Sequence, residues 1–165
     1  MKPLSTPADS AANLKGNSGF MKKALRKVLV VDDNPGMLKV LNKWLKVAGY
    51  DVIEAWDGQM ALDKSRAELP DIILLDILMP GMDGREFVRR LQKDPAIKEI
   101  PIIFITVCID LEKDKGHEEI EINGIRYPGF AKPLHNARLL SLVRKTLNRR
   151  YNSGNPADEE ASNDA

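Results

Sequence analysis

Residues 71–84, DIILLDILMPGMDG, restrict the fold of this chain more than any other stretch. Four consecutive apolar residues, 72–75, stand between Asp71 and Asp76, and the turn formers Pro80, Gly81 and Gly84 follow. A short apolar run bounded in this way is typical of a strand that is buried on both faces. Strands of that kind belong to parallel sheets with helices on either side, so the segment indicates an α/β fold.

The middle of the chain alternates between strand and helix patterns. The patterns typical of strands cover residues 27–31, 50–55, 71–75, 101–107 and a short run at 129–133. The helical patterns cover residues 35–48, 58–69, 84–94 and 137–150. This alternation predicts a doubly wound five-stranded parallel sheet, whose functional sites lie at the carboxyl ends of the strands.

The two ends of the chain differ from this middle part. Residues 1–20 are rich in small and polar residues without periodicity, and residues 151–165 carry acidic but no basic residues. We expect a disordered extension (1–20), one domain (21–150) and a disordered acidic tail (151–165) that is too short for a DNA-binding module. The net charge of +1, the single cysteine and the absence of a bilayer-spanning apolar stretch favour a cytoplasmic protein that binds neither DNA nor membrane.

Polar residues follow the predicted strands at positions that a parallel sheet brings to one edge. Asp32 and Asp33 follow the first strand, Asp76 follows the third, Thr106 lies near the end of the fourth, and Lys132 follows the fifth. Three neighbouring carboxylates repel one another unless a cation is present, and their hard oxygens suit Mg²⁺. A lysine and a hydroxyl suit the oxygens of a phosphoryl group, so a carboxylate here can become an aspartyl phosphate.

Five fragments of the chain resemble the motifs of a known family. VLVVDDN, EAWDGQMAL, DIILLDILMPGMDG, FIT and AKP resemble, in this order, the response regulator receiver domain, over about residues 26–150. The resemblance implies a CheY-like fold with the flavodoxin-like strand order 2-1-3-4-5. Because only the tail follows residue 150, we expect a stand-alone receiver.

The resemblance implies a phosphoacceptor and a metal site. Asp76 accepts a phosphoryl group from the phosphohistidine of a sensor histidine kinase or of a histidine phosphotransfer protein. Asp33, Asp76 and the backbone carbonyl of Leu78 hold Mg²⁺ directly, and Asp32 contributes through a water molecule. The protein is then a signalling component and not an enzyme, apart from slow loss of its own phosphoryl group.

The resemblance also implies two residues that respond to the phosphoryl group. Lys132 contacts the phosphoryl oxygens and is followed by a cis peptide bond to Pro133, whereas Thr106 moves to bind these oxygens in the active state. The output is a phosphorylation-dependent contact with a downstream protein that the sequence does not identify.

Two other functions stay open at this point. A Mg²⁺-dependent phosphotransferase that forms an aspartyl phosphate needs a general acid, commonly two residues after the nucleophile, where this chain has Leu78. A receiver-like binding module that is not regulated by phosphate would not need all five polar site residues, yet they are present. Taken singly, each of these residues also has a structural explanation, such as a strand threonine or a solvated lysine.

Three residues near the predicted site depart from the family pattern. Val107 stands where the family has a small residue, so it should narrow access to Asp76. Leu78 and Cys108 stand where the family flanks the hydrolytic water, and neither side chain orients water well. The sequence therefore predicts slow autodephosphorylation.

The segment 109–130 is the least family-like, because the family has its fourth helix here. Its apolar residues do not recur at the spacing that a helix needs for an apolar face. In EIEINGIRY, by contrast, apolar and polar residues alternate on both sides of Asn123 and Gly124, which is the strongest short-range signal for a hairpin. We predict a hairpin over residues 118–127, with the second strand ended by Pro128. One face of it would carry Ile120, Ile122, Ile125 and Tyr127. The alternative is a short helix with Asn-Gly as its C-cap.

The same segment lacks the aromatic residue that the family uses as a switch. That position, three residues before Lys132, is Gly129 in this chain. Tyr127 or Phe130 would have to replace it. A hairpin here would also remove the family's usual dimer surface and expose a different, partly apolar surface to partners.

Overall fold

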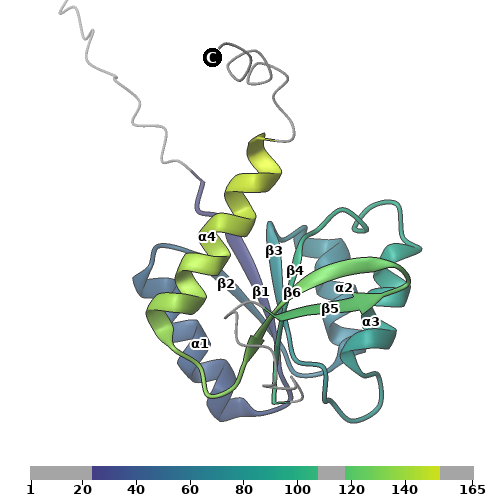
Figure 1. Cartoon of the computed structure of the whole chain (residues 1–165), viewed down its shortest axis with the longest axis horizontal. Helices are drawn as coiled ribbons and strands as arrows, with labels where there is room; N and C mark the ends of the chain where they lie inside the picture. The colour runs from purple at the N-terminus through teal and green to yellow at the C-terminus, as the bar shows by residue number, and fades with distance from the viewer. Residues whose placement is uncertain (1–23, 108–117, 153–165) are drawn as a thin grey trace, which may run out of the picture.

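A six-stranded sheet forms the centre of the computed structural model, which describes residues 24–107 and 118–152 (Figure 1). The strands lie in the order β2-β1-β3-β4-β6-β5. Their bounds are β1 (Lys27–Val31), β2 (Asp51–Ala55), β3 (Ile72–Leu75), β4 (Ile102–Thr106), β5 (Glu118–Ile122) and β6 (Ile125–Ala131). All four strand pairs from β2 to β6 are parallel, and β5 is antiparallel to β6.

The predicted fold is confirmed for the parallel strands but incomplete at one edge. With β6 in the fifth place, the parallel part has the expected order 2-1-3-4-5. The five predicted parallel strands are present, and β5, the first strand of the predicted hairpin, adds a sixth strand that is antiparallel. One strand, β6, is both the fifth parallel strand and the second strand of the hairpin, which were predicted as separate elements.

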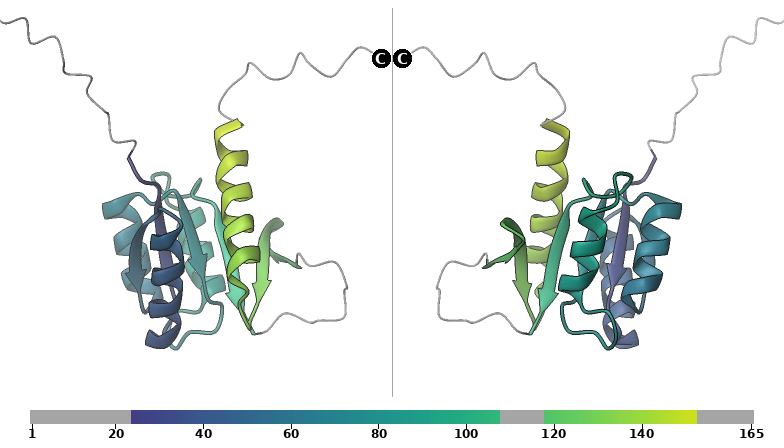
Figure 2. Two further views of the ribbon diagram at one scale, coloured as in Figure 1. Left: turned by 90° about the vertical axis from the view of Figure 1, so that its left-hand side faces the viewer. Right: turned by 90° about the vertical axis from the view of Figure 1, so that its right-hand side faces the viewer.

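Within residues 24–107 and 118–152, four helices cover the two faces of the sheet (Figure 2). They are α1 (Pro35–Val47), α2 (Gly58–Glu68), α3 (Gly84–Gln92) and α4 (Asn136–Asn152). One apolar cluster joins the sheet to α1 and α4, and a second joins it to α2 and α3. Alternate residues of β3 enter the two clusters, and all four of them are 0% exposed. The run of residues 72–75 is therefore buried on both faces, as predicted.

The first turn of α1 begins as the sequence predicts. The side-chain oxygen of Asn34 accepts hydrogen bonds from the backbone nitrogens of Gly36 (2.9 Å) and Met37 (3.2 Å). These contacts satisfy amide groups that have no partner inside the helix, and Pro35 adds none. The cap fixes where the chain turns away from Asp32 and Asp33.

The hairpin over residues 118–127 is confirmed. Asn123 and Gly124 have positive φ angles of 51° and 77°, as a two-residue turn of this type requires. The turn pairs Ile122 with Ile125 and Ile120 with Tyr127. Ile122 is 4% exposed in the cluster beneath α2 and α3, with Ile120 and Tyr127 packed against it. Three of the four residues of the predicted apolar face thus pack on the sheet where the family has its fourth helix, whereas Ile125 is 49% exposed.

Pro128 does not end the second strand of the hairpin, contrary to the prediction. It pairs with Glu119, and β6 continues to Ala131. A two-residue turn closes with a hydrogen-bonded pair, and bonded and non-bonded pairs then alternate, so the Glu119–Pro128 pair requires no amide hydrogen from residue 128. Pairing with β4 begins only at Gly129. A proline is tolerated here because neither neighbouring strand uses its nitrogen.

Polar contacts attach the hairpin to the end of α3. The side-chain nitrogen of Gln92 donates to the Tyr127 hydroxyl (2.7 Å), and its oxygen accepts from the side chain of Asn123 (2.9 Å). The Tyr127 ring also packs edge-on against Phe104, with ring centres 5.8 Å apart. Tyr127 is therefore held on the α3 side of the sheet, whereas Phe130 is buried on the α1–α4 side.

Some sequence predictions lie outside the described residues. These are the extension at residues 1–20, the tail from residue 153 onward, and Cys108. Within the described residues, no helix is long and apolar enough to cross a membrane.

Candidate functional site

The backbone fixes two of the predicted acids at the carboxyl edge of the sheet. Asp32 follows β1 and its amide donates to the carbonyl of Ala55 (3.1 Å). Asp76 follows β3 and its amide donates to the carbonyl of Val31 (2.9 Å). Each bond extends the strand pairing by one residue, so both side chains start from the rigid part of the sheet.

Three carboxylates meet at this edge. One oxygen each from Asp32, Asp33 and Asp76 lies within 4.8 Å of the others. Asp32 and Asp76 are 2% and 6% exposed, whereas Asp33 is exposed to solvent. The structure therefore brings together the three acids that the sequence predicts, in a site that is buried on one side and open on the other.

Lys132 reaches the same acids from the end of β6, on the far side of β4. Its ammonium group donates to the Oδ2 atoms of Asp32 (2.9 Å) and Asp76 (3.1 Å). Its backbone amide donates to the carbonyl of Thr106 (3.0 Å), and the following peptide bond to Pro133 is cis. Thr106 ends β4 and is fully buried. All five predicted polar residues thus lie at one edge of the sheet.

The remaining oxygens of the two buried acids accept backbone hydrogen bonds. Asp32 Oδ1 accepts from the amide of Asn34 (2.8 Å), and Asp76 Oδ1 accepts from the amide of Leu78 (3.2 Å). Each carboxylate is therefore oriented by its own turn, while its other oxygen faces Lys132. Because Leu78 is part of the turn after β3, its backbone lies beside the acids even though its side chain is half exposed.

Burial and the neighbouring charges act on Asp76 in opposite directions. Burial raises the pKa of the Asp76 carboxyl, although Lys132 acts to lower it, and the nearby Asp32 raises it further. Burial lowers the pKa of the Lys132 ammonium, but its hydrogen bonds to the two acids outweigh burial and leave the pKa raised. A simple ion pair would lower the pKa of its acid. The pKa of Asp76 is raised instead because burial outweighs its contacts with Lys132, and the charge of Asp32 adds a smaller effect in the same direction.

The donor set fits a divalent cation with a preference for oxygen. The carboxylates converge on one point, one of them is open to solvent, and a single ammonium group leaves them with net negative charge. Mg²⁺ is held in proteins by one or two carboxylates, with several waters retained. The residues present are therefore suited to this ion.

Exposed apolar side chains surround the site. Trp56 follows β2, Leu78 lies two residues after Asp76, and Val107 follows Thr106; they are 57%, 50% and 64% exposed. Large apolar side chains that stay exposed together at a polar site are suited to contact with another protein. The sequence predicted that Val107 narrows access to Asp76 and that Leu78 cannot orient water, but it did not predict a role for Trp56.

Gly84 is a site residue that the sequence analysis missed. A β-carbon at this position would lie 2.6 Å from the carbonyl oxygen of Asp76 and 2.9 Å from the α-carbon of Ile77. The amide of Gly84 donates to the carbonyl of Ile77 (2.9 Å), so α3 starts directly against the turn that carries Asp76. In the sequence, Gly84 indicated only a turn after Pro80. The close approach of α3 to the backbone after β3 depends on residues that no short sequence pattern identifies.

Comparison with known proteins gives consistent matches. Residues 28–144 match the response regulator receiver domain. The chemotaxis protein CheY4 of Vibrio cholerae is 32% identical, with a TM-score of 0.64 over 74% of this chain and 99% of CheY4. The N-terminal domain of a response regulator receiver protein from Methanoculleus marisnigri JR1 is also 32% identical, with a TM-score of 0.55 over 77% of this chain and 100% of that domain.

A third similar structure contains a metal. It is the receiver domain of the sensor histidine kinase PA1611 from Pseudomonas aeruginosa PAO1, with a magnesium ion coordinated in its active-site cleft. That domain is 26% identical to this chain, with a TM-score of 0.63 over 76% of this chain and 99% of that domain.

Proposed function

This chain belongs to the response regulator receiver domain family, and we propose on that basis that Asp76 accepts a phosphoryl group from a phosphohistidine. Receiver domains are phosphoacceptors of two-component signalling and are generally not enzymes. The donor would be a sensor histidine kinase or a histidine phosphotransfer protein. One observation carries the assignment: Asp76 is a buried carboxylate that shares one ammonium group with a second acid at the end of a central strand.

The transfer replaces one bond to phosphorus by another. A carboxylate oxygen of Asp76 attacks the phosphorus, and an oxygen–phosphorus bond forms as the bond to the histidine nitrogen breaks. The phosphohistidine, protonated on its other ring nitrogen, leaves as the neutral imidazole, and Asp76 carries an acyl phosphate. The Lys132 ammonium, already 3.1 Å from Asp76, is positioned to pair with the phosphoryl oxygens. The hydroxyl of Thr106 would bind one of these oxygens in the phosphorylated state.

Mg²⁺ would be held by Asp33, Asp76 and the backbone carbonyl of Leu78, with Asp32 acting through water. When bound, the ion would offset the negative charge that the incoming phosphoryl group adds to the carboxylates. The excess of carboxylates over ammonium groups supports this assignment, because Lys132 alone does not neutralise the site.

The output of the phosphorylated chain would be a contact with a downstream protein. The hairpin and β6 supply the surface for it, since β6 ends next to Lys132 and begins at the turn of the hairpin. A histidine kinase presents its phosphohistidine in the cytoplasm, which is where we expect this chain to act.

Phosphorylation by a small donor tests the assignment directly. The chain is incubated with acetyl phosphate, with and without Mg²⁺, and the modified residue is identified by mass spectrometry. We expect one acid-stable, base-labile phosphoryl group on Asp76 that requires Mg²⁺. Asp76→Asn should abolish it, and the matched control Asp63→Asn, an exposed acid of α2, should not. An unmodified chain would favour a binding module that phosphate does not regulate, and turnover of the donor would favour a phosphotransferase.

A further inference from the structure

A second cavity lies at the opposite edge of the sheet from Asp76. It has a volume of about 280 Å³ and is bounded by the chain before β1, the connection from α1 to β2, and the last turns of α4. Sites of the α/β fold lie at the carboxyl ends of the strands, whereas this cavity is at the amino ends. It is therefore separate from the phosphoryl site.

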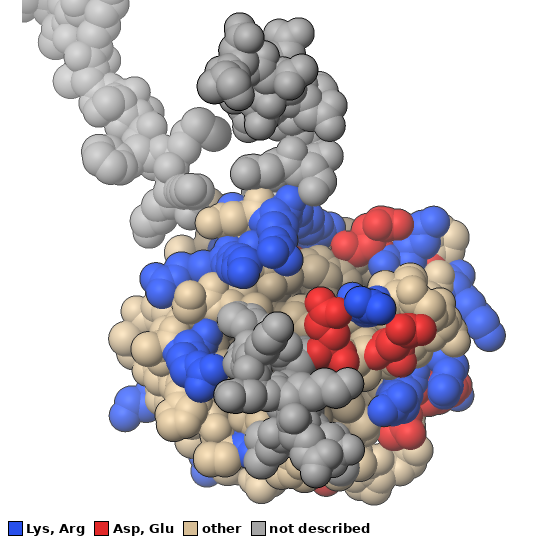
Figure 3. All heavy atoms as spheres, viewed as in Figure 1, with Lys and Arg blue, Asp and Glu red and all other residues tan. Residues whose placement is uncertain are grey.

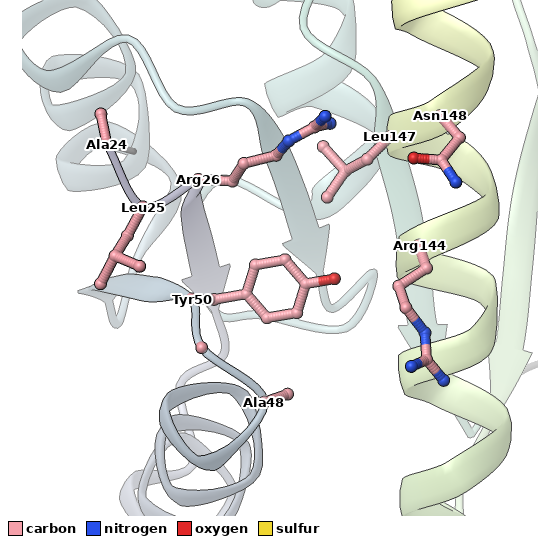
Figure 4. Close-up of a pocket in the computed structure, with 9 residues that line it drawn as sticks. Ala24, Leu25, Arg26, Ala48, Tyr50, Arg144, Leu147 and Asn148 are labelled. Atoms are coloured by element: carbon pink, nitrogen blue, oxygen red, sulfur yellow. The ribbon is translucent and has the colours of Figure 1, made fainter. Parts of the chain in front are cut away.

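The polar groups of this cavity are chiefly cationic. Figure 4 shows the hydroxyl of Tyr50 pointing toward α4, with the guanidinium groups of Arg26 and Arg144 on either side and the amide of Asn148 farther along the helix. Leu147 supplies an apolar wall. Burial raises the pKa of the Tyr50 hydroxyl, whereas Arg144 and Arg26 act to lower it, which agrees with two positive charges close to it. Such a set of donors suits a carboxylate or another anion.

The helix beside the cavity carries positive charge only. From residue 136 to residue 152, α4 has no acidic side chain, and its basic side chains are Arg138, Arg144, Lys145, Arg149 and Arg150. In Figure 3, basic side chains gather over the upper end of α4. A positive patch of this kind attracts acidic segments and repels basic ones.

The two ends of the chain differ in whether their charge is complementary to this basic patch. Residues 1–23 contain four lysines and a single acid, Asp9, so the patch repels them overall. Residues 153–165 contain no base, and their acids are Asp158, Glu159, Glu160 and Asp164. Charge complementarity therefore selects the C-terminal segment.

The C-terminal segment is also long enough to reach the cavity. Arg144 lies about 12 Å back from Asn152 along the helix, at about 1.5 Å per residue. The stretch from Asn152 to Asp158 spans up to about 20 Å when extended. Gly154 and Pro156 within it favour a change of direction after the helix.

We propose that the acidic segment at residues 158–160 docks in the cavity formed by Tyr50, Arg26 and Arg144 of the same chain. Carboxylates of the segment would accept hydrogen bonds from the two guanidinium groups and from Tyr50. Residues 153–165 contain no large apolar side chain, so charge and not burial would hold the segment in place. Docking would shield the basic end of α4 from anionic partners without touching Asp76.

Side-chain NMR of the full chain tests the proposal. One variant combines Asp158→Asn, Glu159→Gln and Glu160→Gln, and a matched control combines Glu119→Gln and Glu121→Gln in the hairpin. At an ionic strength of about 0.01 M, where the Debye length is about 30 Å, the tail variant should shift the Tyr50 ring and Arg144 Nε resonances, and the control should not. At about 1 M, where screening acts within about 3 Å, wild type and tail variant should coincide.

A synthetic peptide of residues 153–165 supplies the second arm. When it is added to the tail variant, it should restore the wild-type resonances at concentrations on the order of millimolar. This is the effective concentration that a segment has when a short flexible linker joins it to its binding site. Arg144→Gln should remove the response of Tyr50 to both the tail variant and the peptide. Unmoved Tyr50 and Arg144 resonances in the tail variant at low salt would overturn the proposal. Restoration by inorganic phosphate but not by the peptide would also overturn it, because the cavity would then take a free anion.

Discussion

Replacing Gly84 with alanine should destabilise the fold and distort the phosphoryl site together. The new β-carbon would lie 2.6 Å from the carbonyl oxygen of Asp76, where ordinary contacts begin at 3.4 Å. Both the contacted oxygen and the α-carbon of Ile77 at 2.9 Å are backbone atoms, so no side chain can rotate away. Either α3 or the turn after β3 must move, and that turn holds Asp76 and the carbonyl of Leu78.

The magnitude follows from two opposing terms. Overpacking of this kind typically costs about 1–3 kcal/mol. Alanine is favoured over glycine in a helix by up to about 1 kcal/mol, and by less in the first turn, where Gly84 stands. We therefore expect the free energy of unfolding to fall by about 1–2 kcal/mol. The rate of phosphorylation of Asp76 should fall as well, because the turn that orients it is displaced.

Gly58 provides a matched control for this substitution. It also begins a helix, α2, and its added β-carbon would lie 2.7 Å from Met82 Sδ. The thioether of Met82 can rotate away, but its β-carbon, 2.9 Å from the added atom, can move only with the backbone. Gly58→Ala should therefore destabilise the fold by less than Gly84→Ala, by up to about 1 kcal/mol. Urea unfolding followed by circular dichroism measures both variants. Equal stability of the two would refute the reasoning from backbone contact.

Three further predictions concern the charge, the hairpin and the lifetime of the phosphoryl group. Burial raises the pKa of Asp76, so the fold loses stability as pH rises from the unfolded-state pKa to the raised folded-state pKa. Without Mg²⁺, Asp76→Asn should therefore raise the free energy of unfolding at neutral pH by an amount on the order of 1 kcal/mol and raise the melting temperature, and a lower melting temperature would contradict repulsion among the three acids. Gly124→Ala forces a positive φ on alanine and should lower the free energy of unfolding by about 1–2 kcal/mol, which would reduce hydrogen-exchange protection in β5 and β6. The control Asn123→Gly should keep this protection, and Asp76 should still be phosphorylated in the Gly124→Ala variant. The phosphoryl group on Asp76 should be long-lived, because the half-exposed Leu78 cannot orient water; Leu78→Asn should shorten the lifetime measured by phosphate release, and a wild-type lifetime of seconds would contradict this.

The sequence predicted those features whose cause is local. The buried strand at residues 72–75, the cap at Asn34 and the turn at Asn123 and Gly124 each depend on a few neighbouring residues. The edge of the sheet at which the polar residues meet was predictable because parallel strands bring their carboxyl ends together. The alternation of strands and helices therefore predicted that Asp32 and Asp76 lie near each other, although it gives no distance between them.

The features that the sequence did not predict depend on contacts between distant segments. Whether Pro128 breaks a strand depends on which neighbour its nitrogen faces, and the pairing partners are unknown from the sequence alone. The bridge from Gln92 to Asn123 and Tyr127 joins residues far apart in the chain, and a glutamine in the last turn of a helix has no sequence pattern that predicts such a contact. Gly84 was read only as a turn residue for the same reason, because its close neighbour is a backbone atom of another element.

The continuity of β6 makes this molecule suitable for an optical sensor. The seven residues of this strand run from the hairpin turn to the residue before Lys132, a length of about 23 Å. A dye attached at Ile125, which is 49% exposed, would sit at the far end of the strand from the acids. A change in its emission on phosphorylation would show that the strand responds when Lys132 is engaged, and the dye would leave the opening above Asp76 clear for a donor protein. The hairpin thus offers a labelling position that one continuous strand joins to the site and that is remote from it.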